Sequence, residues 1–274
     1  MGLFFNYNKV GPGIDKNAPK KKGIALYTEL FFRKFWLLIR ANMLYFAASL
    51  PIIAIYYLII LTYLPDGLNN DMQWQFSLIF TVIITVLWGT GPATCGYVYL
   101  LRNFAREEHV WLRSDFFEKL KENFKLGITV LLCDLVLLIL GINAAFFYSS
   151  LSKEGVAIAK YGFVALIFVF AIYTFMHYYI YECGVTFEGK VGETLKNSLL
   201  MGMAELPANL IFTLSISLLT FFAFGFLTPV AIIVLFMTSW ISFMRFPIDF
   251  YVARVIKRKF IDNQQNGESG EKDV

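Results

Sequence analysis

Five long stretches of the chain contain only uncharged and mostly apolar residues. They cover 41–65, 72–101, 135–152, 161–181 and 206–244. A helix that crosses a lipid bilayer needs about 20 mostly apolar residues, so each of the first four stretches predicts one crossing. The fifth is 39 residues long and predicts two, joined by a turn between Gly225 and Pro229. We therefore expect six transmembrane helices, near 40–64, 76–101, 127–149, 157–181, 206–224 and 227–248.

The predicted fold class is an all-α polytopic membrane protein. Hydrophobic residues make up 58% of the chain and charged residues only 16%, whereas about 25% of the residues of soluble domains are charged. Residues 1–260 are predicted to form a single six-span helical domain. The polar residues 261–274 are predicted to form a disordered cytoplasmic tail.

The distribution of basic residues predicts the orientation of these helices. Of the 24 Lys and Arg residues, 22 lie in segments that the six spans place on one side of the membrane. These segments precede the first span, connect the second to the third and the fourth to the fifth, and run from Arg245 to the end of the sequence. Only Lys153 and Lys160 lie elsewhere. Short segments rich in Lys and Arg stay on the cytoplasmic side, so we expect both chain ends there. The net charge of +4 follows from this topology and does not indicate a nucleic-acid partner.

A short amphipathic segment precedes each odd-numbered span and predicts a helix lying at the cytoplasmic membrane surface. The clearest is Ser114 to Gly127, in which Phe116, Phe117, Leu120 and Phe124 recur at helical spacing. Its counterparts are Leu30 to Arg40 and Thr194 to Gly202. Short matches at separations of 85 and 75 residues suggest a threefold repeat of one surface helix and one helical hairpin.

The second span contains a stretch of small residues, Gly89 to Gly96, with the sequence GTGPATCG. Small side chains let helices approach closely inside a membrane. We interpret Gly89, Gly91, Pro92 and Gly96 as contacts either with another helix of this chain or with a helix of a partner protein, with a ligand pocket at the bend as a third alternative. Pro92 also removes one backbone hydrogen bond, which predicts a bend in the helix.

Few ionisable residues lie at membrane depth, and such residues are candidates for function. They include Asp134 in the third span, His177 in the fourth, and Arg245 and Asp249 in the sixth, all on the cytoplasmic side. One interpretation is that Asp134 pairs with Arg245 or Arg40 and joins helices. The alternative is a proton or ion relay, which is disfavoured because the outer half of the membrane region offers mainly aliphatic and aromatic residues.

No pattern in the sequence indicates catalysis or a bound cofactor. A glycine-rich phosphate-binding loop with its lysine is absent, and so is the Gly-x-Ser-x-Gly pattern of a serine nucleophile. The two histidines, His109 and His177, are too far apart for a short zinc-binding motif. We therefore expect neither an enzyme nor a metal or cofactor site.

Several segments resemble the YesL-type family of Gram-positive bacterial membrane proteins, a domain of unknown function. They are FFNYNKVGPG at 4–13, NMLYFAASLPI at 42–52, GPATCGYVYLLRNFAREE at 91–108 and DFFEKLKENFKLG at 115–127. The resemblance implies a multi-pass protein of the bacterial plasma membrane that is often encoded beside importers and enzymes for complex carbohydrates. It implies no catalytic residues.

The resemblance favours an accessory membrane subunit that assists a carbohydrate ABC importer by binding its permease subunits, with the ATPase as a further candidate partner. The alternative is a small secondary transporter or channel that acts alone. The chain is not predicted to be a permease itself. Glu188 and Leu206-Pro207 have the spacing of the loop with which permeases dock on the ATPase, but Gly189-Lys190 and Thr194 replace its alanines and glycine.

Overall fold

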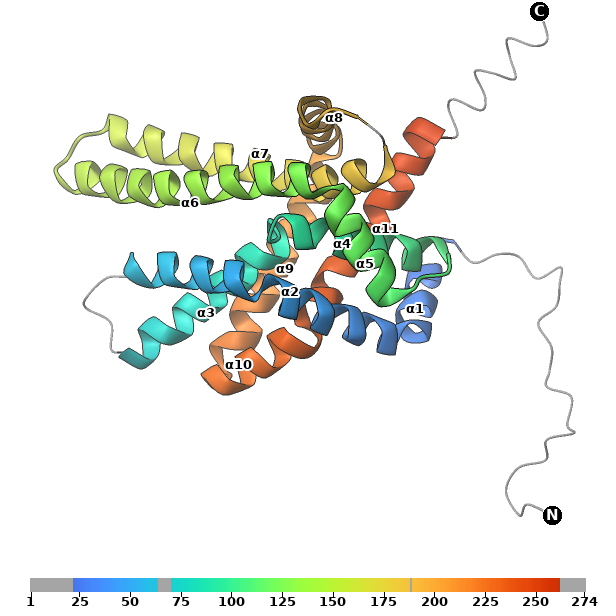
Figure 1. Cartoon of the computed structure of the whole chain (residues 1–274). Helices are drawn as coiled ribbons and strands as arrows, with labels where there is room; N and C mark the ends of the chain where they lie inside the picture. Colours follow the sequence, from blue (N-terminus) through green and yellow to red (C-terminus); the bar gives the residue numbers. More distant parts are fainter. Residues whose placement is uncertain (1–21, 64–69, 188, 262–274) are drawn as a thin grey trace, which may run out of the picture.

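The fold was analysed in a computed structural model that describes residues 22–63, 70–187 and 189–261. These residues form helices and no strand (Figure 1). Segments 4–13 and 262–274, Glu188 and residues 65–69 of the first predicted external loop lie outside the described residues. The helices are α1 (Gly23–Arg33), α2 (Phe35–Thr62), α3 (Asn70–Leu87), α4 (Pro92–Arg106), α5 (Leu112–Glu122), α6 (Phe124–Lys153), α7 (Ile158–Thr186), α8 (Val191–Ala204), α9 (Leu206–Gly225), α10 (Pro229–Leu235), η1 (Phe236–Trp240), α11 (Ile241–Ile256) and η2 (Lys257–Ile261).

Five helices are long and apolar enough to cross a membrane: α2, α6, α7, α9 and the continuous stretch Pro229–Lys259 that contains α10, η1 and α11. The helices α3 and α4 pass the same test only together, and their axes differ by 63°. Counted as one bent span, this pair brings the number to six. The prediction of an all-α polytopic membrane protein is confirmed.

Several helices extend beyond the predicted limits of their spans, past charged residues. The helix α2 begins at Phe35, before Arg40, and α7 continues through Glu182 to Thr186. The last span extends through Arg245 to Lys259. Charge-free runs mark the part of a helix that faces lipid, whereas a charged residue near a helix end can be buried with partners or extend to the membrane surface.

The three surface helices share one construction, in which a single residue separates each from the span that follows. These residues are Lys34 between α1 and α2, Asn123 between α5 and α6, and Glu205 between α8 and α9. Their separations of 89 and 82 residues differ from the predicted 85 and 75 by 4 and 7. Because an amphipathic pattern repeats every 3.6 residues, a shift of one or two turns gives an equally good match in sequence.

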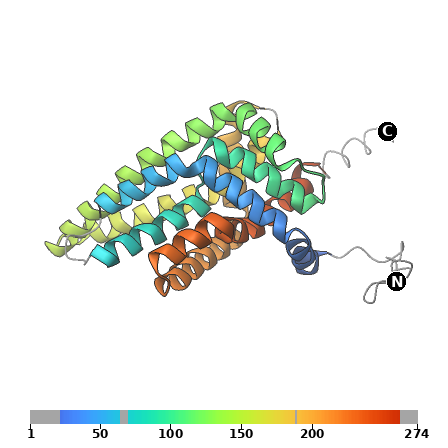
Figure 2. The ribbon, with the colours of Figure 1, turned by 60° about the horizontal axis from the view of Figure 1, so that its bottom comes forward.

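The predicted surface helix Leu30 to Arg40 is wrong in its position. The surface helix is α1, which ends at Arg33, and residues from Phe35 onward belong to the first span. The other two were predicted close to where they lie, as α5 and α8. Figure 2 shows α1, α5 and the C-terminal part of α11 at one end of the bundle, with the turn between α6 and α7 at the other.

Candidate functional site

The second predicted span is broken at membrane depth. The helix α3 ends at Leu87 and α4 begins at Pro92. Two residues of the connection have positive backbone φ, 89° at Gly89 and 71° at Gly91, which glycine adopts readily and other residues rarely do. Pro92 then occupies the first turn of α4, where its missing N–H is not needed. The bend predicted from Pro92 is therefore a complete break.

The small residues of the break contact other helices of this chain. A Cβ atom on Gly91 would lie 2.8 Å from both the carbonyl oxygen of Gly127 and the Cβ of Leu131, on α6. Gly96 lies against the backbone of Phe116 on α5, and Gly89 against the side chain of Thr94. These contacts fill the surroundings of the break with the protein's own helices.

Side chains from α2 and α11 donate hydrogen bonds to backbone carbonyl groups at and just after the end of α3. Nη1 of Arg245 donates hydrogen bonds to the carbonyl oxygens of Val86 (3.0 Å) and Leu87 (3.3 Å). The hydroxyl of Tyr56 on α2 donates to the carbonyl oxygen of Gly89 (3.2 Å). The last carbonyls of a helix lack partners within it, and lipid cannot supply any. Arg245 therefore caps a helix end inside the membrane region, and its Nε also lies 3.3 Å from Oδ1 of Asp249.

A cluster of hydroxyl groups surrounds the start of α4. Oγ1 of Thr94 accepts a hydrogen bond of 2.7 Å from the backbone N–H of Thr90. The hydroxyl of Ser49 on α2 lies 2.7 Å from Oγ1 of Thr90, and the hydroxyl of Tyr45 lies within 3.1 Å of both threonine hydroxyls. All four side chains are buried. The cluster joins α2 to the break without an ionised group.

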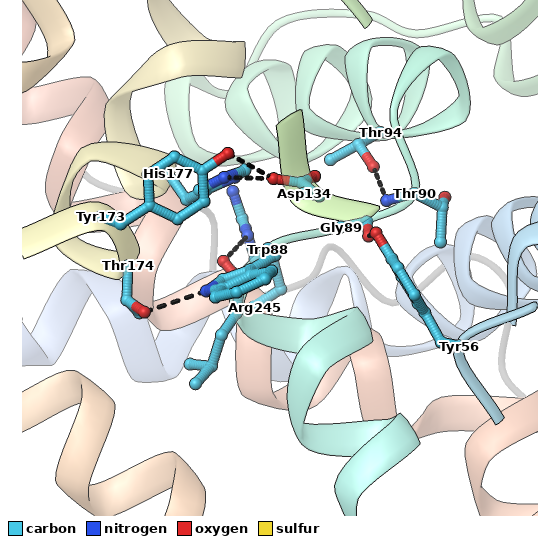
Figure 3. Close-up of polar contacts among 11 residues, drawn as sticks. Tyr56, Trp88, Gly89, Thr90, Thr94, Asp134, Tyr173, Thr174, His177 and Arg245 are labelled. Carbon is cyan, nitrogen blue, oxygen red and sulfur yellow. Dashed lines mark hydrogen bonds and ion pairs between the residues drawn. The ribbon is translucent and has the colours of Figure 1, made fainter. Parts of the chain in front are cut away.

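Asp134 on α6 meets two residues of α7 beside the break (Figure 3). Its Oδ1 accepts a hydrogen bond of 2.7 Å from the hydroxyl of Tyr173 and lies 2.9 Å from Nε2 of His177. The indole of Trp88, inside the break, stacks on the ring of His177 with centroids 5.8 Å apart. Its Nε1 donates to Oγ1 of Thr174 at 2.9 Å. The break, α6 and α7 thus form one buried polar cluster.

The predicted pairing of Asp134 with Arg245 or Arg40 is wrong. Arg245 pairs with Asp249 and the end of α3, and Arg40 is exposed. Charge complementarity suggested an arginine, whereas the fold places a histidine and a tyrosine on the neighbouring helix. Tyr173 and His177 are four residues apart and so share one face of α7, a signal that the sequence did contain.

Further ionisable groups lie between this cluster and the end of the bundle that holds the surface helices. Glu182 on α7 is completely buried, and within the described residues neither of its carboxylate oxygens has a hydrogen-bond partner. Arg102 on α4 donates through Nη1 to the carbonyl oxygen of Val185 (2.8 Å) and to Oγ1 of Thr186 (2.9 Å). The ionisable groups therefore continue along α4, α7 and α11 on one side of the break.

The aromatic residues predicted for one face of the second surface helix separate in the structure. Phe116 is buried and Leu120 partly buried, but Phe117 and Phe124 are 45% and 52% exposed. Asn123 separates α5 from α6, and Phe124 belongs to α6. The helical spacing of α5 therefore does not extend to Phe124. Phe116 and Leu120 hold α5 against the bundle, and the two exposed rings are available to lipid.

The site joins its helices through hydrogen bonds and close polar contacts of Asp134, Tyr173 and His177. Among residues 22–63, 70–187 and 189–261, no group of three or more His, Cys, Asp and Glu side chains is arranged to hold a metal ion. Cys95 and Cys183 are buried free thiols, and Cys133 is a free thiol on the exposed side of α6.

Comparison with known proteins gives one partial match. A family model described as "Protein of unknown function, DUF624" matches residues 74–145. The match includes most of α3, the break, α4, α5 and the part of α6 that carries Asp134. It ends before His177. No curated protein and no solved structure matches the chain.

Proposed function

We propose that this protein is a non-catalytic accessory subunit that binds the permease of a carbohydrate ABC importer in the bacterial plasma membrane, with both chain ends in the cytoplasm. The resemblance to YesL-type proteins supports the importer, and the match to a family of unknown function is consistent with that resemblance. The concentration of basic residues at the surface helices supports the orientation.

The observation that carries the proposal is the exposure of α7. Only 17% of its most apolar 18-residue window is buried within the chain, a share close to the 22% of α9 and below the 28% to 39% of the other three candidate spans. Tyr161, Val164, Ala165 and Phe168 are all exposed and follow one another at helical spacing. The opposite side, which includes Gly162 and Phe170, packs on α6. One complete face of α7 is therefore free for another helix.

A partner helix suits this face because helices associate in lipid through close packing and not through apolar surface alone. The small side chain of Ala165 lies between the larger side chains of Tyr161 and Phe168, so the face has a shallow depression at its centre. Inside the bundle, Arg245 donates its hydrogen bonds to the backbone of α3 and so supports the fold. Both features favour a protein that binds a neighbour over one that handles a solute.

The proposal is tested by purifying the tagged chain from cells that express it at the native level. Gentle detergent extraction should recover permease subunits in a fixed ratio with the tagged chain, and the ATPase with them. Recovery of the chain alone from several mild detergents would contradict the proposal. A tagged membrane protein of similar abundance and span number serves as the control for non-specific recovery.

A second candidate, transport by this chain alone, is favoured by the broken span. Transporters often place their binding sites where a transmembrane helix is interrupted near an ionisable group. The break at 88–91, with Asp134 and His177 beside it, has this arrangement. Proteoliposomes that contain only this chain should then show a solute or proton flux that Asp134→Asn abolishes, while Glu118→Gln on the exposed side of α5 leaves it unchanged. Absence of flux from a correctly folded preparation would exclude this candidate.

A further inference from the structure

Two hollows lie beside α1 at the end of the bundle that carries the surface helices. The first has a volume of about 280 Å³ and lies between α1, α9 and α11. Its lining is apolar and aromatic apart from one arginine, Arg254. The apolar and aromatic lining includes Tyr27, Phe212, Pro247, Phe250 and Tyr251. A hollow of this composition can receive a hydrocarbon chain.

The second hollow has a volume of about 430 Å³ and lies between the end of α4, α1 and α11. Its charged lining residues are Arg106, Glu107, Glu108, Arg254 and Lys257. Glu107 also forms an ion pair with Arg33 of α1, which offsets its charge. The lining itself carries three cationic groups and two carboxylates, and because Glu107 is already paired with Arg33, the hollow carries an excess of positive charge.

Two arginines of the second hollow are suited to bind an anion. Nε and Nη2 of Arg106 are shielded from solvent and have no hydrogen-bond partner among the described residues, although the guanidinium also interacts electrostatically with the buried carboxylate of Glu182. Buried donors of this kind are normally paired, and a guanidinium pairs best with carboxylate or phosphate oxygens. The guanidinium of Arg254 stands over the ring of Phe250, with Cζ 4.0 Å from the ring centroid. This contact holds its position, and both residues line the two hollows.

We propose that the two hollows together bind one anionic phospholipid. Its phosphate contacts Arg106, Arg254 and Lys257, and part of one acyl chain enters the apolar hollow beside Tyr27 and Phe212. Basic pockets between helices at the cytoplasmic face of a membrane are suited to anionic headgroups. The adjoining apolar hollow favours a lipid over a soluble phosphate compound. This site is independent of the importer proposed above.

The test uses the full-length purified chain in detergent, titrated with phosphatidylglycerol and followed by native mass spectrometry. We expect one phosphatidylglycerol to bind at the lowest concentrations, in preference to phosphatidylcholine with the same acyl chains. The double variant Arg254→Gln, Lys257→Gln should weaken this binding by at least about tenfold, because each basic group near an anionic headgroup contributes to affinity. The matched control is Lys119→Gln, Lys121→Gln on α5, which removes the same charge from the same end of the bundle and should leave binding unchanged.

A second titration uses glycerol phosphate, which carries a phosphate group but no acyl chains. It should bind much more weakly than phosphatidylglycerol. Equal binding of the two phospholipids would overturn the proposal, and so would equal losses in the two double variants. Binding of glycerol phosphate as tight as that of the lipid would show a soluble phosphate site and would also overturn it. Unchanged thermal unfolding of each variant establishes that a loss of binding is not a loss of fold.

Discussion

At the residue scale, Asn42 on α2 completes the hydrogen bonding of another transmembrane helix. Its Nδ2 donates to the carbonyl oxygens of Phe236 (2.9 Å) and Met237 (2.8 Å), and its Oδ1 accepts from the backbone N–H of Ser242 (2.8 Å). These groups lie in and just after the π-helical turn η1. A π-helical turn interrupts the regular α-helical ladder, and lipid cannot satisfy the groups that this leaves. The side chain of Asn42 supplies the hydrogen-bond partners of these backbone groups.

Replacement of Asn42 should therefore destabilise the protein. We expect Asn42→Leu to lower the free energy of unfolding by about 2 kcal/mol, because buried backbone groups lose their partners. Asn143→Leu is the matched control, since Asn143 is exposed toward the C-terminal end of α6 and binds the hydroxyl of Tyr63. Unfolding in mixed detergent micelles, followed by tryptophan fluorescence, measures both. Equal effects of the two changes would contradict this role of Asn42.

Glu205, between α8 and α9, makes stability depend on pH. Burial alone would raise the pKa of Glu205, but hydrogen bonds from Lys259 and from the hydroxyl of Tyr251, together with the charge of Arg258, lower the pKa below its ordinary value of 4.5. A carboxylate with a lowered folded-state pKa stabilises the protein above the pKa of the unfolded chain. That stability is lost as the pH falls through the folded-state pKa.

We accordingly expect thermal stability to fall as the pH is lowered below about 4.5, and part of this loss to be absent in Glu205→Gln. The variant should be less stable than the wild type at neutral pH and closer to it in acid. Glu154→Gln, directly after the C-terminal end of α6, is the control and should not change the profile. Parallel profiles for the wild type and Glu205→Gln would show that Glu205 does not contribute.

Among single residues, the sequence placed Asp134, His177 and Arg245 on long helices but did not predict their partners well. The helix on which a residue lies could be read from the apolar runs, because it depends on the local sequence. Their partners lie on other helices, and the packing of α6 against α7 decides them. Trp88 and Asn42 were missed because an uncharged polar side chain in an apolar run gives no comparable signal.

At the element scale, the break between α3 and α4 requires glycine at position 91. Gly91 has φ 71° and ψ −124°, and a Cβ atom there would approach the backbone of Gly127 to 2.8 Å. Gly91→Ala should lower the free energy of unfolding by about 3 kcal/mol, from backbone strain and overpacking together. Thermal unfolding in detergent measures this effect.

Gly192→Ala is the control for this change. Gly192 lies within α8, and nothing lies within 4 Å of the position that its Cβ would take. Alanine there should be neutral or slightly stabilising because glycine is the poorer helix former. A fully stable Gly91→Ala variant would show that the break is not specified by glycine.

The elements themselves were largely predictable from the sequence, and their interruptions were less so. Long apolar runs dictate helices because a lipid environment requires every backbone group to be satisfied within the helix. The 63° angle between α3 and α4 also depends on the two positive-φ glycines, whereas the sequence argument used Pro92 alone. The breaks at Lys34 and Asn123 carry no glycine or proline, so no local signal marked them.

At the scale of the whole molecule, ionisable side chains lie inside the bundle and apolar side chains face outward, an arrangement that fits the proposed accessory subunit. Ionisable side chains gather inside the bundle beside the break and toward the surface helices. The N-terminal part of α7 presents an apolar face that no other helix of the described chain covers. We therefore propose that α7 binds the partner and that the buried polar cluster supports the structure.

The most direct test of this account is photo-crosslinking in the membrane of cells that encode the importer. A photoreactive phenylalanine analogue is placed at Val164, on the exposed face of α7, and in a control at Leu218, which is 53% exposed on α9. The account predicts a specific adduct between position 164 and a permease subunit, identified by mass spectrometry, and none from position 218. It would be contradicted by adducts of equal yield from both positions, by an adduct with a second copy of this chain alone, or by the absence of any protein adduct from Tyr161, Val164, Ala165 and Phe168.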